Sequence, residues 1–125
     1  MEFRISDTFT ESLARLTGDE QKAAKLWAYR DPQGFAALLD ILGECIVFHL
    51  IRQLDAGADA VQIFDSWAGV LDDRDFETYA ARPVRRIVDM VRAERPGARI
   101  IAFANGGGYN LKTHRKATQA DAIGL

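Results

Sequence analysis

The chain has 125 residues, with 16 lysines and arginines against 18 aspartates and glutamates. Apolar residues make up 48% of it and charged residues 27%, a globular balance that excludes a disordered segment. The net charge of −2 argues against a dedicated nucleic-acid binder, which needs a basic excess.

Cysteine content and hydropathy exclude further kinds of protein. The single cysteine, Cys45, excludes an internal disulfide and a multi-cysteine zinc site. The amino terminus has no long apolar core, and no uninterrupted apolar run reaches about 18 residues. We therefore expect no signal peptide, no membrane association and a cytoplasmic protein.

Two helices are expected in the first half of the chain. A short one covers residues 19–30, and Asp31 before Pro32 is typical of an N-cap followed by proline at the first helical position. A longer helix then continues to Ala56-Gly57, where glycine favours termination. Its apolar residues recur at three- and four-residue steps, which predicts one buried stripe. The stripe consists of Phe35, Leu38, Leu39, Leu42, Cys45, Ile46, His49, Leu50 and Leu54.

The second half of the chain alternates strands with helices. Short apolar runs predict strands at residues 60–64 and 100–103, and a strand-like end at 121–125. A helix opens at the acidic residues 72–75, with a break or kink expected at Pro83, and a weak helix covers residues 111–118. This order predicts an α/β fold with about three parallel strands and intervening helices.

Ligands of parallel α/β folds bind at the carboxyl ends of the strands, which directs attention to two loops. In the first, the Ser66 hydroxyl and nearby backbone amides are suited to an anion, while Asp65 or Ser66 capping the local backbone, with Trp67 simply packed, is an equally weighted alternative. In the second, Gly106, Gly107 and Gly108 are candidates for an anion-binding nest, although a plain turn is favoured there.

The other polar and reactive residues are weaker candidates for a functional site. Cys45 and His49 lie on the predicted buried stripe. We expect Cys45 to act as a small buried apolar residue, and His49 to be a hydrogen-bonded histidine in the core or at its edge. His114 belongs to a short basic run expected to be a solvated face. Two histidines without an HExxH pattern give a metal site little support, and the arginines at 82, 85 and 86 are surrounded by acidic residues in the sequence.

Four stretches together resemble the uroporphyrinogen decarboxylase family. They are LWAYRDP at residues 26–32, AGADAVQIFDSWAG at 56–69, FANGGG at 103–108 and DAIGL at 121–125. The second is highly specific, Pro83 matches a family proline, and the resemblance runs from about Glu20 to Leu125. We therefore divide the chain into a poorly matched segment, 1–18, and a partial uroporphyrinogen decarboxylase domain, 19–125.

The resemblance implies a cytoplasmic lyase of haem and porphyrin biosynthesis with a TIM (β/α)8 barrel, commonly a homodimer, that needs no cofactor or metal. Such enzymes convert the four acetate side chains of uroporphyrinogen III to methyl groups, giving coproporphyrinogen III. The serine of the FDSWAG stretch contacts the substrate and corresponds to Ser66 here, and Phe64 faces the same cleft.

The catalytic set is incomplete in these 125 residues. The family's substrate-binding arginines, pyrrole-binding aspartate, active-site tyrosine and late histidine have no counterpart, and Asn105 stands where many relatives have lysine. A closed barrel typically needs about 250 residues, so we expect a partial barrel that is inactive alone and associates with itself or another chain. The alternatives are a non-catalytic truncated relative acting through association, and a small anion-binding α/β module.

Overall fold

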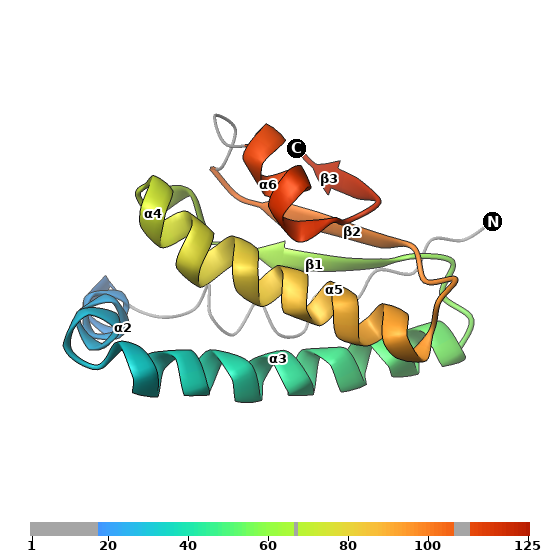
Figure 1. Ribbon diagram of the computed structural model, residues 1–125, viewed down its shortest axis with the longest axis horizontal. Helices are drawn as coiled ribbons and strands as arrows, with labels where there is room; N and C mark the ends of the chain where they lie inside the picture. Colours follow the sequence, from blue (N-terminus) through green and yellow to red (C-terminus); the bar gives the residue numbers. More distant parts are fainter. Residues whose placement is uncertain (1–17, 67, 107–110) are drawn as a thin grey trace.

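The computed structural model describes residues 18–66, 68–106 and 111–125, and the structural statements below concern these ranges (Figure 1). Helices α2 (Gly18–Arg30) and α3 (Pro32–Asp55) come first. Strand β1 (Val61–Asp65) is followed by the short turn η1 (Ala68–Val70) and by three consecutive helical segments, α4 (Asp73–Asp75), η2 (Phe76–Ala81) and α5 (Arg82–Glu94). Strand β2 (Ile100–Ala104), helix α6 (Leu111–Thr118) and strand β3 (Ala122–Gly124) complete the chain.

The three strands form one parallel sheet in the order β1-β2-β3, as predicted. Alternate side chains of β1 and β2, such as Val61 and Ile100, are buried with residues of α3 and α5, so the main core lies between the sheet and these two helices. Figure 1 shows α3 and α5 running side by side along this face of the sheet. The intervening residues, including Phe64 and Phe103, point to the opposite face.

The predicted caps of the long helix are confirmed. The Asp31 carboxylate accepts a hydrogen bond from the Gly34 amide at 2.9 Å, and Pro32 occupies the start of α3. At the other end Ala56 caps the helix, and Gly57 adopts a positive φ of 99°. Local turn chemistry therefore sets both ends of this helix.

The predicted buried stripe of α3 is wrong at Cys45 and His49, which are both exposed. The residues that are buried are Gly43, Val47 and Leu50. Gly43 has no side chain, and a Cβ built there would lie 3.6 Å from Ile87 of α5, so α5 packs along this side of the helix. That contact turns Cys45 and His49 outward, where the His49 ring is hydrogen-bonded to Gln53 at 2.8 Å.

Helix α3 bears on the expectation of no membrane association. By length and composition it is apolar enough to cross a membrane, because only Asp40 and Glu44 interrupt its most apolar portion. Only 17% of that portion is buried within the described fold. The same helix packs on α5 and β1, as does the core helix of an α/β fold.

The break expected at Pro83 takes the form of a π-helical segment. Asp72 caps the start of α4 by accepting a hydrogen bond from the Asp75 amide at 2.8 Å. The chain then widens into the π-helix η2 before the regular α5 begins, with Pro83 in the first turn of α5. Because proline lacks an N–H and crowds the carbonyl four residues earlier, the wider turn relieves the conflict that an α-helix would create here.

His114 is buried, which contradicts its predicted place on a solvated face. It is 1% exposed, whereas Lys112, Arg115 and Lys116 of the same helix are exposed. The basic run spans more than one turn of α6, so one position in it faces inward. That position is His114, whose ring packs edge-on against Phe76 of η2 with centroids 5.4 Å apart.

Candidate functional site

The loops that follow β1 and β2 are joined at the carboxyl edge of the sheet. The Asn105 amide donates a hydrogen bond to the Asp65 carbonyl at 2.8 Å, which extends the parallel ladder by one residue. The Gly69 amide in turn donates to the Asn105 carbonyl at 3.0 Å. The first loop is therefore held against the second through backbone bonds, independently of most side chains.

This join requires glycine. A Cβ built at Gly69 would lie 2.5 Å from the Asn105 carbonyl oxygen and 2.6 Å from the Gly106 Cα. Gly106 also adopts a φ of +74°, in the region that side-chain-bearing residues rarely enter. The glycines of the two predicted ligand loops thus bring the loop backbones into direct contact.

Asp65 has the capping role that the sequence left as an alternative. Its carboxylate accepts a hydrogen bond from the Ala68 amide at 2.9 Å, which closes a tight turn at the start of η1. Ser66 lies within that turn and is half-buried at the sheet edge. The Asp65 carboxylate thus helps to hold the backbone of this turn, and with it the backbone of Ser66, in place.

Phe64 belongs to a row of residues across the sheet. It is paired in register with Phe103, and Phe103 with Gly124. The two phenyl rings meet edge to face with centroids 5.5 Å apart. A Cβ at Gly124 would lie 2.9 Å from the Phe103 ring, so the glycine leaves room for that ring. The two rings lie on the sheet face opposite α3 and α5, and Phe64 precedes Ser66 by two residues.

Several predicted site residues lie outside the described residues. These are Trp67, Gly107 and Gly108, so the proposed nest is described only at Gly106, which is exposed. Asn105, beside it, is also exposed, and its backbone groups take part in the loop contact. The anion-nest role of Gly106, Gly107 and Gly108 stays a prediction, as do the substrate contacts of Ser66 and Phe64.

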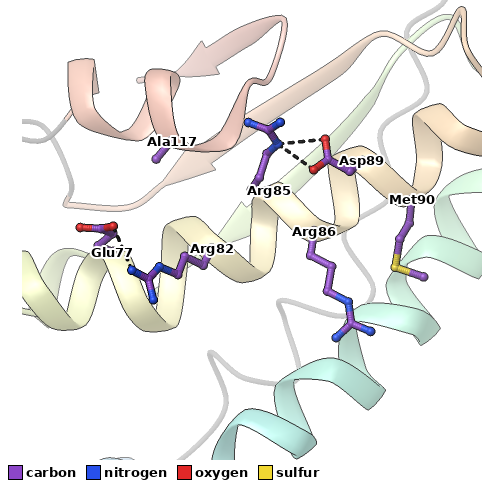
Figure 2. A pocket seen from close by; sticks show the side chains of 7 residues that line it. All are labelled: Glu77, Arg82, Arg85, Arg86, Asp89, Met90 and Ala117. Carbon is purple, nitrogen blue, oxygen red and sulfur yellow. Dashed lines mark hydrogen bonds and ion pairs between the residues drawn. The ribbon is translucent and has the colours of Figure 1, made fainter.

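The arginines of α5 lie elsewhere and are paired with acidic residues. A shallow groove of about 400 Å³ between α5 and α6 is lined by Arg82, Arg85 and Arg86 among other residues (Figure 2). Arg85 binds both oxygens of Asp89 at 2.8 and 2.9 Å, and Arg82 pairs with Glu77 at 3.3 Å. Arg86 extends toward α3, where it pairs with Asp40. Nearby carboxylates therefore offset the charge of these three arginines.

The described residues contain no cluster of three or more histidine, cysteine, aspartate or glutamate side chains placed to hold a metal ion. Sequence reasoning missed one residue close to the candidate site, His114. Burial lowers the pKa of its imidazole below the ordinary value, while the charge of Asp65 acts in the opposite direction. Helical periodicity could have predicted this burial: when the basic residues 112, 115 and 116 face outward on a helix, position 114 faces the other way.

The fold and the edge site define a class of protein: a parallel βα-repeat unit with its candidate ligand loops at the carboxyl ends of the strands. Comparison with known families makes this specific. Residues 13–125 match the model of the uroporphyrinogen decarboxylase (URO-D) family, so the chain belongs to that family. Its three parallel strands and intervening helices fit part of the TIM barrel of this family.

Curated relatives carry the same name. The chain is 55% identical over 106 residues to the uroporphyrinogen decarboxylase of Agrobacterium fabrum, 56% to that of Sinorhizobium fredii and 54% to that of Brucella anthropi. Each match covers 85% of this chain and 31% of the relative. The chain therefore spans about a third of the length of these relatives.

Proposed function

We propose that this chain supplies one wall of the substrate cleft of a uroporphyrinogen decarboxylase. In this proposal the Ser66 hydroxyl donates a hydrogen bond to a carboxylate of the porphyrinogen, and the ring of Phe64 packs against the apolar part of the same molecule. Both residues stand at the carboxyl edge of a parallel sheet, where barrel enzymes bind their substrates.

The reaction replaces each acetate carboxylate by a proton. The bond between the methylene carbon and the carboxylate breaks, carbon dioxide leaves, and the methylene carbon takes up a proton to become a methyl group. Protonation of the pyrrole ring beforehand gives the electron pair of the broken bond a place to go, and the ring gives up that proton again once the methylene carbon has been protonated. Ser66 and Phe64 position the substrate for these steps.

One observation carries the proposal: the Ser66 turn is locked to the neighbouring loop by the contact of Gly69 with Asn105 and Gly106. A hydroxyl can orient a substrate only if its backbone is held in place. The contact between the loops holds that backbone through Gly69, Asn105 and Gly106, and the Ser66 side chain takes no part in it. The high identity to enzymes named uroporphyrinogen decarboxylase supports the same role.

Complementation tests this role. The chain is produced together with the parts of the Agrobacterium fabrum relative that it does not match, and formation of coproporphyrinogen is measured. We expect activity from the mixture and none from either part alone. In the active mixture, Ser66→Ala raises KM by about tenfold, the cost of losing one charge-assisted hydrogen bond. Thr113→Ala, which removes an exposed hydroxyl from α6, leaves KM unchanged. An unchanged KM for Ser66→Ala removes Ser66 from the site.

Association with other chain segments is part of the proposal. The relatives are about three times as long as the matched portion, so a barrel is completed only when further strands join the edges of this sheet. We expect light scattering to give a mass above that of one chain for the purified protein. A sharp monomeric peak together with cooperative unfolding would favour the alternative of a small self-contained module.

A further inference from the structure

The side chain of Asn105 stands beside Ser66 at the carboxyl edge of the sheet, and the proposed binding role does not use it. In the sheet register Asp65 is paired with Ala104, and the Asn105 amide continues the ladder by donating to the Asp65 carbonyl at 2.8 Å. The next residues on the two strands, Ser66 and Asn105, are therefore neighbours. Because neighbouring strands lie about 4.8 Å apart, the two side chains begin at about that separation.

Ser66 and Asn105 face the same side of the sheet. Successive side chains of a strand point to opposite faces. Ala104 is buried in a small core cluster with residues of η2, and the Asp65 carboxylate turns to the same side, where it accepts the amide of buried Ala68. The residues that follow, Ser66 and Asn105, therefore point to the other face, on which the phenyl rings of β1 and β2 meet edge to face.

The face that Ser66 and Asn105 share carries no charged side chain within the described strands. Its strand residues are mostly apolar: Gln62, Phe64, Ile101, Phe103, Ala122 and Gly124. Without a lysine or arginine on this face, the strands can hold an anion only through neutral hydrogen-bond donors. The serine hydroxyl and the asparagine carboxamide are two such donors, side by side at the carboxyl edge.

The backbone of Asn105 is held on both sides, and its side chain is exposed. The N–H donates to the Asp65 carbonyl, and the carbonyl accepts the Gly69 amide at 3.0 Å. The carboxamide takes no part in these backbone bonds and is exposed at the edge. A short side chain on a held backbone loses little conformational freedom when it binds a ligand, so it contributes affinity at a small entropic cost.

We propose that Asn105 is a second substrate-binding residue, whose carboxamide N–H donates a hydrogen bond to the carboxylate that Ser66 binds. Each donor takes one carboxylate oxygen at about 2.9 Å, an arrangement that two side chains starting about 4.8 Å apart can make. The apolar face beside the pair packs against the ring that bears the carboxylate. The identity of the ligand, a porphyrinogen carboxylate, rests on the proposed function.

Binding of uroporphyrin, the fluorescent oxidised form of the proposed substrate, tests this in the mixture of the chain with the unmatched parts of the Agrobacterium fabrum relative. We expect Asn105→Ala to raise Kd about tenfold, the cost of one hydrogen bond to a charged group. Asn105→Asp has the same shape but repels the carboxylate, so its Kd rises about a hundredfold. Gln33→Ala, which removes an exposed amide from α3, leaves Kd unchanged. Equal Kd values for Asn105→Asp and Asn105→Ala overturn the proposal.

A double-mutant cycle tests whether one carboxylate is shared. When two donors hold the same group, loss of the first weakens the second. The combined variant Ser66→Ala with Asn105→Ala should therefore raise Kd by less than the product of the two single effects. Single effects that multiply overturn the shared carboxylate.

Urea unfolding separates binding from a structural role. Asn105→Ala and Asn105→Asp should match the unmodified chain in stability, because the loop contact uses only backbone atoms of this residue. A loss of stability that parallels the loss of binding overturns the proposal.

The unmodified chain gives a measurement that needs no variant. Apart from Asn105, only position 110 is an asparagine, so NMR of the mixture with isotope-labelled asparagine in the chain resolves its side-chain amide. We expect this signal to shift when uroporphyrin is added, and an unshifted signal overturns the proposal. A raised Kd for Ser66→Ala with an unchanged Kd for Asn105→Asp rejects the role of Asn105 alone, whereas a mixture that does not bind uroporphyrin rejects the proposed function as well.

Discussion

The backbones of Gly69 and Gly106 are in contact, although 37 positions separate them in the chain: a Cβ at Gly106 would lie 3.2 Å from the Gly69 Cα. The first residue follows β1 and the second follows β2, so their contact joins two neighbouring ligand loops. Together with the hydrogen bond from the Gly69 amide to the Asn105 carbonyl, this contact holds the starts of the two loops together at the carboxyl edge of the sheet. Ser66 belongs to the first of these loops.

Gly69→Ala therefore destabilises the chain. The added methyl collides with backbone atoms of Asn105 and Gly106, which cannot move without breaking the loop contact. We expect a loss of about 1–3 kcal/mol in the free energy of unfolding measured with urea. Gly97→Ala is the matched control, since no heavy atom lies within 4 Å of its Cβ position and its φ is outside the left-handed region. Equal stability of the two variants would contradict the close approach.

A substitution at Gly57 tests backbone strain alone, without the steric collision expected at Gly69. A Cβ at this position meets no heavy atom within 4 Å, but the φ of +99° is unfavourable for any residue with a side chain. Gly57→Ala is expected to cost about 1 kcal/mol, and Gly57→Asn less, because asparagine tolerates left-handed conformations better. Thermal unfolding of both variants measures the difference. A neutral Gly57→Ala would show that α3 ends in another conformation.

Asp121 ties the starts of β2 and β3 together. Its carboxylate accepts hydrogen bonds from the Ile100 amide at 2.8 Å and from Arg92 at 2.9 Å, and the Ile100 bond in particular lowers the pKa of Asp121. Asp121→Asn should cost about 1 kcal/mol at neutral pH, a value reduced by solvent exposure. Because the folded-state pKa is depressed, this contribution is present above the ordinary value of 3.8 and disappears as the pH falls through the folded-state pKa.

The pH dependence distinguishes this role from a general effect of charge. Urea unfolding from neutral pH downward should bring the stabilities of the unmodified chain and Asp121→Asn together in acid. Asp59→Asn, at an exposed position just before β1, should follow the unmodified chain throughout. A constant gap between the unmodified chain and Asp121→Asn at every pH would show that the carboxylate charge is not the stabilising group.

The exposure of Cys45 has a direct chemical test. The cysteine lies on the outer side of α3, so a thiol reagent such as DTNB should react with the native chain without denaturant. The expected result is complete modification of one thiol per chain, with no reaction in Cys45→Ser. A thiol that reacts only after unfolding would place Cys45 in a buried position and would contradict the orientation of this helix.

Several parts of the candidate site were predictable from the sequence. The location of Ser66 and Phe64 at the carboxyl edge of the sheet follows from the rule that ligand loops stand after parallel strands, and their substrate contacts stay predictions. For the loop after β1, anion binding by Ser66 and capping by Asp65 or Ser66 were equally weighted, because both need polar residues directly after the strand. His114 was predicted incorrectly, since its exposure depends on α6 packing against η2, a contact between residues far apart in the chain.

By itself, the sequence determined the order of the main helices and strands and both ends of the long helix. Asp31 with Pro32, Gly57, Asp72 and Pro83 act through hydrogen bonds and φ angles of their immediate neighbours, which a linear reading captures. Only the tertiary structure decided which sides of α3 and α6 are buried and that the Gly69 and Gly106 backbones touch. These outcomes depend on packing between distant segments, where removing one side chain, as at Gly43, decides how a neighbouring helix approaches.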